Sequence, residues 1–549
     1  MFRSACSAAI NRITEKPMHA IRLRHFRGFS DTGWLDLAPI TLLVGQNSSG
    51  KSSVLRFFPL LRQSVEANTT GPFLWYGRYV DFGTFADVVN KDADELEMEC
   101  AFRLVIPAVR FSLSTRGRSR TARSVPGPSR GELLPVTVAM RVRGEPNKEA
   151  LSLPSSVHIQ LSDHIVDIGF DKGGLVKRFT VNDLDVLELG PEDSYEIAPG
   201  PGILPVLLPR LGERHQHPSV AFFRHLSLGG APWVSKALFK TVRPLFHGNT
   251  QDSTIRRIIS GLQPSSSEDM LAQLKNVRGG GDYFKRKIGR LTVDSWRFKR
   301  LRDQIIAEHV GVILDAIDDH LKETASNVTY MAPVRATIER YYRIQGLAVS
   351  EVDYEGRNLA MFLRGLSEPE RRDFQSWVKE AMGFVVNARM ASGHIYLTVT
   401  EEGSDAEHNL ADVGFGVSQV LPVLAQLWVV IRRARPRGRR RRGPVILAVE
   451  QPELHLHPRL QARLAEIFMR AIEMAASQDL DLRIVIETHS EAIVNGLGHG
   501  IAAGNFDPGW AKVALFDRRD GKTSVSFSEY NQDGFLKDWP YGFFDSVTA

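Results

Sequence analysis

The sequence has only two cysteines, Cys6 and Cys100, among its 549 residues. Two thiols cannot build a disulfide framework or a zinc site made of four cysteines, and their scarcity fits a protein that folds in a reducing cytoplasm. Long apolar runs are also missing. The longest, residues 420–431, is too short to cross a bilayer, and the N-terminus has no signal-peptide core. We therefore expect a cytoplasmic protein without a membrane segment.

Outside one short segment the sequence has no excess of positive charge. The formal net charge is +6, but residues 431–444 contain eight arginines and no acid, so the rest of the chain carries −2 (six minus eight). The isoelectric point therefore does not indicate a general polyanion-binding surface. We expect the arginine-rich segment to be a solvated insertion with weak, salt-sensitive affinity for polyanions.

The most informative stretch is a glycine-rich loop between a strand pattern and a helix pattern. It fits the G-x-x-x-x-G-K-[ST] phosphate loop at every fixed position. The loop reads Gly45, Gln46, Asn47, Ser48, Ser49, Gly50, Lys51 and Ser52, followed by Ser53. Residues 40–44 predict a buried parallel strand, and residues 53–61 predict a helix. Backbone N–H groups of such a loop wrap a phosphate, Lys51 supplies charge, and the Ser52 hydroxyl can ligate magnesium. The stretch predicts a nucleotide site.

Two more buried strands end in polar residues that suit such a site. Residues 445–449 run into Glu450, Gln451 and Glu453, and residues 484–486 run into the block that contains His489. An acid at the carboxyl end of an apolar strand is where a magnesium-bound nucleotide needs a carboxylate, which indicates Glu450. His489 follows an aligned strand, so we expect it to contact phosphate rather than to be a core histidine.

A zinc site next to this acidic strand end is the less favoured interpretation. His455 and His457 lie close to Glu453 in the sequence. Two histidines at i and i+2 beside a proline lack the usual spacing of helical zinc ligands, so we do not expect zinc there.

Residues 410–419 place glycines at the start of an apolar helix pattern. Gly414 and Gly416 come first, and Ser418 and Gln419 follow. Backbone N–H groups and the dipole at such a helix start are available to an anion. The pattern therefore predicts an anion site at the start of this helix.

The order of patterns predicts an α/β fold with a mixed sheet, an antiparallel meander and an inserted helical region. Strand patterns at 96–113, 135–142, 156–161 and 175–181, separated by turn residues, are typical of a meander. From 203 to 326 the pattern is helical. Its apolar stripe comprises Trp296, Leu301, Ile305, Ile306, Ile313, Ile317 and Leu321. We therefore divide the chain at 1–202, 203–326 and 327–549.

The first part of that helical stripe is strongly basic. Residues 285–302 contain eight basic residues and one acid, Asp294, with Trp296 and Phe298 interleaved. Such a mixture can follow a nucleic-acid backbone and stack on bases, but it is more often a solvated helix face with its aromatics in the core. Both interpretations stay open.

Taken together, these blocks resemble the ABC-class ATPases of the SMC-like branch, in which a long insertion splits one ATPase head. Lys51 and Glu450 are separated by 399 residues (450 minus 51), far more than in a transport ATPase. Within the branch, Glu450-Gln451-Pro452-Glu453-Leu454-His455-Leu456-His457-Pro458, the block at 487–490 and the end at 533–545 look like OLD-like defence ATPases with a C-terminal domain of unknown function, including the Septu PtuA type.

The resemblance implies a role for each block. Residues 45–52 would be Walker A, Glu450 the Walker B acid, His489 the switch histidine and residues 414–419 the signature loop. The cofactors would be ATP and Mg²⁺. Two heads would sandwich two nucleotides as a homodimer or a higher homo-oligomer.

Two departures from the family pattern matter. The signature loop lacks the Ser-Gly-Gly core of transporters. Gln451 stands where many relatives place the glutamate that polarises the attacking water. An amide cannot take a proton, so we expect slow hydrolysis unless Glu453 or a histidine substitutes.

The leading functional hypothesis is an ATP-driven dimerising switch in antiphage defence. Only 59 residues follow Ser490, too few for a fused nuclease domain, so we expect any effector nuclease to be a separate chain. Two alternatives are a DNA-repair ATPase whose inserted arm acts on DNA and a nucleotide sensor that hardly hydrolyses ATP.

Overall fold

The computed structural model describes residues 18–67, 69, 71–107, 133–145, 148–210, 231–335, 338–344, 349–401, 403, 406–413, 415–433, 443–519 and 522–539. The predictions about Gly414, most of the arginine-rich segment and the end of the 533–545 block therefore lie outside the described residues. The chain folds into two compact units. The first comprises residues 1–26, 64–75 and 82–323, and the second comprises residues 27–63, 76–81 and 324–549.

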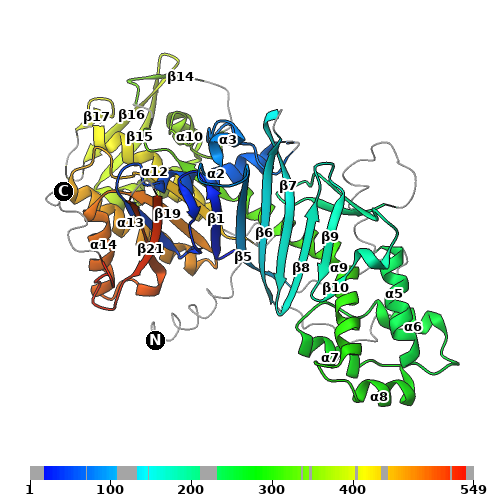
Figure 1. The fold of residues 1–549 in the computed structure, drawn as a ribbon. Coiled ribbons are helices and arrows are strands. Elements are labelled where there is room, and N and C mark those ends of the chain that lie inside the picture. The colour runs from blue at the N-terminus through cyan, green and yellow to red at the C-terminus, as the bar shows by residue number, and fades with distance from the viewer. Residues whose placement is uncertain are drawn as a thin grey trace. The chain divides into compact units, whose positions relative to one another are not determined.

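The first unit is built on an antiparallel meander. Its strands are adjacent in the order β10-β9-β8-β7-β6-β5-β1 (Figure 1). They are β1 (Ala20–Phe26), β5 (Glu97–Pro107), β6 (Leu133–Glu145), β7 (Lys148–Leu161), β8 (His164–Phe170), β9 (Val176–Val181) and β10 (Leu184–Asp185). Alternate residues of β8 are buried, the pattern expected of a sheet with one face on a core. The predicted meander is confirmed.

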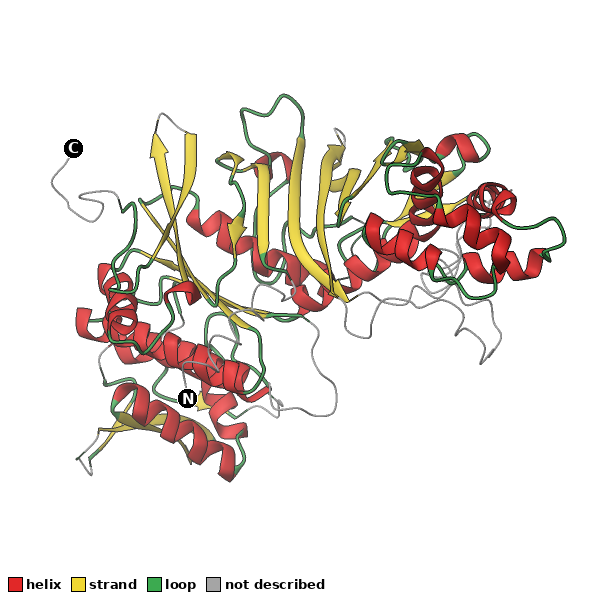
Figure 2. Cartoon of the chain, turned by 90° about the horizontal axis from the view of Figure 1, so that it is seen from below, coloured by secondary structure: helices red, strands yellow, loops and turns green. Residues whose placement is uncertain are grey.

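Helices of the inserted region complete this unit. They are α5 (Pro232–Val242), η2 (Arg243–Leu245), α6 (Asp252–Ile259), α7 (Ser267–Lys275), α8 (Gly281–Gly289) and α9 (Trp296–Ser326). Two short helices, α3 (Phe85–Val88) and η1 (Leu187–Leu189), precede the inserted region. A two-stranded sheet pairs β11 (Tyr195–Ala198) with β12 (Val206–Pro209). Figure 2 shows the meander as a row of adjacent strands. Strand β12 falls inside the segment predicted to be helical, which corrects the start of that prediction.

The α9 stripe is confirmed except at its first member. Leu301, Ile305, Ile306, Ile313, Ile317 and Leu321 are buried, but Trp296 is 69% exposed. Phe298 takes the core position in the first turn of α9, because it is fully buried. The prediction that Trp296 belongs to the core is therefore wrong.

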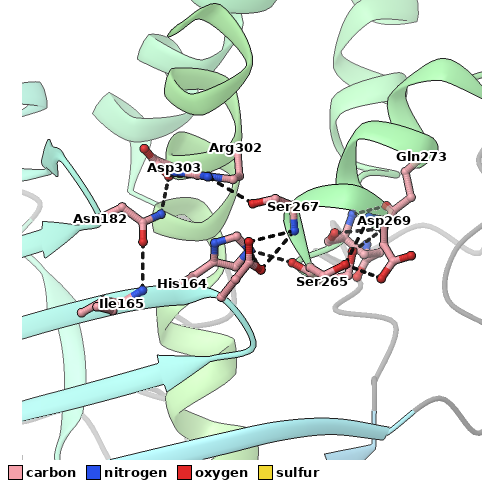
Figure 3. Close-up of polar contacts among 12 residues, drawn as sticks. His164, Ile165, Asn182, Ser265, Ser267, Asp269, Gln273, Arg302 and Asp303 are labelled. Atoms are coloured by element: carbon pink, nitrogen blue, oxygen red, sulfur yellow. Dashed lines mark hydrogen bonds and ion pairs between the residues drawn. The ribbon is translucent and has the colours of Figure 1, made fainter. Parts of the chain in front are cut away.

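A polar network holds α7 and α9 to the end of the meander (Figure 3). The Arg302 guanidinium donates to Asp303 Oδ1 at 2.8 Å and to Ser267 Oγ at 3.1 Å. Asn182 donates to the same Asp303 oxygen, and His164 Nε2 lies 2.8 Å from the Ser265 carbonyl oxygen. Buried polar groups need such partners, so the network fixes how the helices are placed within this unit.

The second unit contains a six-stranded sheet in the order β13-β18-β19-β4-β20-β21. Strands β13, β18, β19, β4 and β20 are parallel to their neighbours, and β21 is antiparallel to β20. The strands are β4 (Ile40–Gly45), β13 (Val328–Met331), β18 (Val445–Glu450), β19 (Leu482–Thr488), β20 (Ala511–Arg519) and β21 (Lys522–Glu529). Every residue of β4, β18 and β19 is buried, as expected for central parallel strands.

Helices and a smaller sheet surround these strands. The helices are α2 (Lys51–Glu66), α10 (Leu359–Gly365), α11 (Glu368–Met382), α12 (Phe415–Arg433), α13 (Pro458–Ser477), α14 (Glu491–Ala502) and η3 (Pro508–Trp510). The smaller sheet comprises β14 (Tyr342–Arg343), β15 (Phe384–Ala391), β16 (His394–Glu401) and β17 (Glu407–Asn409). The short strands β2 (Phe29–Asp31) and β3 (Leu35–Asp36) precede β4 in the chain. The sheet that contains β4 joins segments from both ends of the chain, so the predicted α/β fold with a split head is confirmed. No helix of the described residues could span a membrane.

Candidate nucleotide site

The phosphate loop connects β4 to α2, as the sequence predicts. The loop needs its two glycines, because a Cβ on Gly45 would lie 2.3 Å from the Phe516 carbonyl oxygen and one on Gly50 would lie 2.5 Å from the Phe29 ring. Gly50 also has a φ of +88°, which side chains disfavour. Gln46, Asn47 and Ser48 are exposed. The loop therefore presents backbone rather than side-chain bulk to a ligand.

Lys51 is buried at the base of this loop. Its Nζ donates to the carbonyl oxygens of Gly45 at 3.1 Å and Gln46 at 2.7 Å. Burial lowers the pKa of the ammonium, and the negative charges of Glu487 and Glu453 oppose that shift. The lysine is therefore oriented by the loop and lies within the field of two carboxylates.

The carboxylate bonded to Ser52 belongs to Glu487. Ser52 Oγ donates to Glu487 Oε1 at 2.7 Å, while Glu487 Oε2 is buried without a hydrogen-bond partner among the described residues. Burial and the nearby charge of Glu450 raise the pKa of Glu487 to about 7. A hydroxyl beside a carboxylate oxygen with spare acceptor capacity is a donor set that Mg²⁺ prefers. The residues present thus fit a magnesium ion.

Glu450, the predicted magnesium carboxylate, is engaged elsewhere. Arg56 binds it through two hydrogen bonds, Nε to Oε1 at 2.7 Å and Nη2 to Oε2 at 2.8 Å. The Tyr330 hydroxyl donates to Oε1 at 2.7 Å. Glu450 and Glu487 are register partners on β18 and β19, so the two acids share one edge of the sheet. The sequence predicts that Ser52 and Glu450 serve the same magnesium ion. In the structure Ser52 is bonded to Glu487, and Glu450 is bonded to Arg56 and Tyr330.

Glu453 and His489 lie together, as predicted for the two strand ends. The His489 backbone N–H donates to Glu453 Oε1 at 2.7 Å, and Glu453 Oε2 is buried without a partner among the described residues. Burial raises the pKa of Glu453. Burial and the charge of Lys51 lower the pKa of His489, so its imidazole is neutral at neutral pH.

Gln451 has a left-handed backbone at the end of β18. Its φ is +41°, and its N–H donates to the Glu487 carbonyl oxygen at 2.8 Å. A non-glycine residue at positive φ is uncommon, so this turn is held by its neighbours. The hydrogen bond ties the strand end that carries Glu450 and Gln451 to the one that carries Glu487.

The predicted signature residues lie at the start of α12. Gly416 is in the first turn, where a Cβ would meet the His455 carbonyl oxygen at 3.1 Å. Ser418 and Gln419 are buried. Gln419 exchanges hydrogen bonds with the backbone of Arg335, accepting from its N at 3.2 Å and donating to its O at 3.3 Å. Ser418 and Gln419 thus lie inside the unit, whereas Gly416 lies in the first turn of α12, and contact of these residues with an anion stays a prediction.

His457, considered for zinc, caps a helix. Its Nδ1 accepts from the Arg459 backbone N–H at 3.3 Å, and α13 begins at the adjacent Pro458. Proline suits that first helical position.

Sequence reasoning missed Arg56, Tyr330, Arg335 and Glu487. Arg335 is 2% exposed and donates from Nη2 to the Glu450 carbonyl oxygen at 3.0 Å, while its Nε and Nη1 have no partner among the described residues. Burial lowers the pKa of Arg335 to about 10. Two signals were available. In the sequence, Arg56 follows Ser52 by one helical turn, and Glu487 comes at the end of an apolar strand pattern, as Glu450 does.

Comparison with known proteins matches part of the chain to one family model. Residues 247–495 match the family model described as "AAA domain, putative AbiEii toxin, Type IV TA system". The matched range includes the strand ends at Glu450 and His489 and begins after the phosphate loop. Residues 247–495 are therefore similar to an AAA domain. No curated protein matches the chain.

Solved structures of SMC heads are among the similar folds. An Smc head bound to the C-winged helix domain of ScpA has a TM-score of 0.33 and 10% identity, covering 93% of this chain and 97% of that chain. An Smc head with an extended coiled coil from Pyrococcus furiosus, bound to the C-terminal domain of ScpA, has a TM-score of 0.32 and 13% identity. The match covers 93% of this chain and 96% of that chain. The SMC head domain from Thermotoga maritima has a TM-score of 0.32 and 9% identity, and the match covers 93% of this chain and 98% of that chain.

Proposed function

We propose that the protein binds ATP at the loop from Gly45 to Ser52 and uses it as a conformational switch. The observation that carries this proposal is the placement of Lys51 and Ser52 beside the buried Glu487 carboxylate. Backbone N–H groups and the lysine charge would hold the phosphates. Ser52 and Glu487 would hold Mg²⁺, which when bound neutralises charge on the β- and γ-phosphates.

Glu453 is our candidate for the base in hydrolysis. Gln451 cannot accept a proton, whereas Glu453 has a free buried oxygen and interacts electrostatically with Lys51. Its raised pKa moves it toward the neutral range in which a general base is most effective. The neutral His489, whose backbone orients Glu453, would contact the phosphates.

We further propose that two copies pair through nucleotide and that the paired state licenses a separately encoded effector nuclease in antiphage defence. The backbone at Gly416 has the helix-start form of an anion site, while Walker A of the same chain already cradles the phosphates. A γ-phosphate from a second copy would satisfy it, and two-fold symmetry supplies this contact twice. The matching family's description, which names a toxin of a type IV system, supports a role in such conflicts.

One observation favours a second candidate function, an ATP sensor with little hydrolysis. The Glu450 carboxylate accepts all its described hydrogen bonds from Arg56 and Tyr330. The neighbouring Gln451 has an amide side chain, which cannot accept a proton. If Arg56 keeps Glu450 after ATP binds, the site holds nucleotide without turning it over. Phosphate release measured beside ATP affinity separates the two candidates.

The first test is Lys51→Ala, with Lys522→Ala as the matched control. Lys522 is an exposed lysine on β21 of the same unit. We expect Lys51→Ala to abolish binding of a fluorescent ATP analogue because the loop loses its charge, and Lys522→Ala to bind normally. Unchanged affinity in Lys51→Ala would refute the nucleotide site.

A further inference from the structure

Helix α8, the segment that follows it and the first turn of α9 carry seven cations and one exposed tryptophan. We define the basic tip as Lys285, Arg286, Lys287, Arg290, Trp296, Arg297, Lys299 and Arg300. Five of its seven cations are exposed and two are half-buried. Among the described residues, none of the seven has an acidic partner. The tip therefore concentrates positive charge in a chain whose other residues, outside the arginine-rich segment, carry a formal net charge of −9 (six minus eight minus seven).

Arg302, the eighth basic residue of residues 285–302, differs from the seven cations of the tip because it is paired with an acid. It is 11% exposed in its side chain and is bonded to Asp303 and Ser267 inside the network of Figure 3. The network anchors α9 just after the tip. Arg297, Lys299 and Arg300 are thus carried on the helix that this network anchors, whereas the other four cations lie on α8 or directly after it.

Trp296 is the second, independent feature of the tip. Its side chain is 69% exposed, and the Arg297 guanidinium lies 5.4 Å from the ring centroid. Phe284 and Phe298 fill the local core, so the indole is not needed there. An exposed aromatic ring among cations is the arrangement on which unpaired bases stack while phosphates are neutralised.

We propose that the basic tip binds single-stranded nucleic acid. The cations would contact the backbone and Trp296 would stack on a base. A membrane surface is disfavoured, because Trp296 is the one large hydrophobic side chain exposed on the tip and interfacial helices need a wider apolar face. The proposal does not depend on ATP, because the tip and the nucleotide site belong to different compact units.

The charge test replaces Arg286, Arg290, Arg297 and Arg300 by Gln. Gln is a good helix former, so α8 and α9 should persist, which circular dichroism checks. The control replaces four scattered exposed cations without described partners, Lys91, Arg343, Arg364 and Arg372, by Gln. Fluorescence anisotropy with a labelled single-stranded oligonucleotide is measured between 50 and 200 mM NaCl. Each lost phosphate contact lowers the slope of log K against log salt by about 0.7 for a single strand.

We expect the tip variant to lose up to about three units of that slope and the control variant to keep it. Trp296→Ala should weaken single-strand binding at least about fivefold and leave binding of the matched duplex unchanged. Lys51→Ala should bind the oligonucleotide normally. Equal affinity in the tip variant, equal loss in the control, or full affinity in Trp296→Ala would each overturn the proposal. A tip variant that loses binding to anionic vesicles but keeps its oligonucleotide affinity would also overturn the proposal.

Discussion

Asp318 on α9 is a buried acid whose replacement by asparagine should stabilise the protein at neutral pH. Its Oδ1 accepts hydrogen bonds from the backbone N–H groups of Ile203 at 2.7 Å and Leu204 at 2.8 Å. Burial, together with the charges of Asp319 and Asp315, raises its pKa from 3.8 to about 6. Asparagine offers the same carbonyl oxygen to both N–H groups without a charge, so it keeps the bonds.

The size of the effect follows from the shift. Raising the pKa by about 2.2 units makes the ionised form about 3 kcal/mol less favourable in the folded state. The pKa of Asp318 is higher in the folded state than in the unfolded state. The stability that protonated Asp318 contributes is therefore fully present below pH 3.8 and is lost as the pH rises through about 6. Asp318→Asn should therefore gain up to about 3 kcal/mol at pH 8 and about half of that at pH 5. For a unit of about 280 residues, 3 kcal/mol corresponds to roughly 5 °C in Tm.

Thermal unfolding at pH 5 and pH 8 measures this gain, and Asp94→Asn is the matched control. Asp94 is an exposed acid of the same compact unit, so removing its charge should change stability by less than about 0.5 kcal/mol. Asp318→Ala should destabilise the unit, because both N–H groups lose their acceptor. Destabilisation by Asp318→Asn at pH 8, or a gain independent of pH, would refute the reasoning.

Three further predictions concern the nucleotide site. Gly50→Ala should abolish ATP binding and lower stability by at least about 1 kcal/mol, because a Cβ would meet the Phe29 ring; calorimetry checks both effects. Glu453→Gln should stop phosphate release with ATP affinity retained, and Gln451→Glu should raise the rate; a fast Glu453→Gln enzyme would exclude Glu453 as the base. Mixing inactive Lys51→Ala with inactive Gly416→Arg should restore part of the activity through one intact shared site, whereas a dead mixture of folded, co-purifying chains would argue against a site shared between copies.

Local patterns in the sequence determined much of this protein. The phosphate loop, the buried strands on either side of it, the meander and the helix after Pro458 follow from residue spacing of 2 or 3.6 and from the conformations of glycine and proline. These signals lie within about ten residues, so one sequence suffices to read them. The strand ends at Glu450 and His489 were predictable for the same reason.

Tertiary structure alone decided which of these groups meet. The pairing of β18 with β19 and of β19 with β4 brings Glu487 to Ser52, residues 435 positions apart, and leaves Glu450 to Arg56 and Tyr330. The burial of Arg335 and the exposure of Trp296 are equally invisible in the sequence. The direction of a side chain at the end of a strand depends on register and on neighbours from distant segments, and no local period records either.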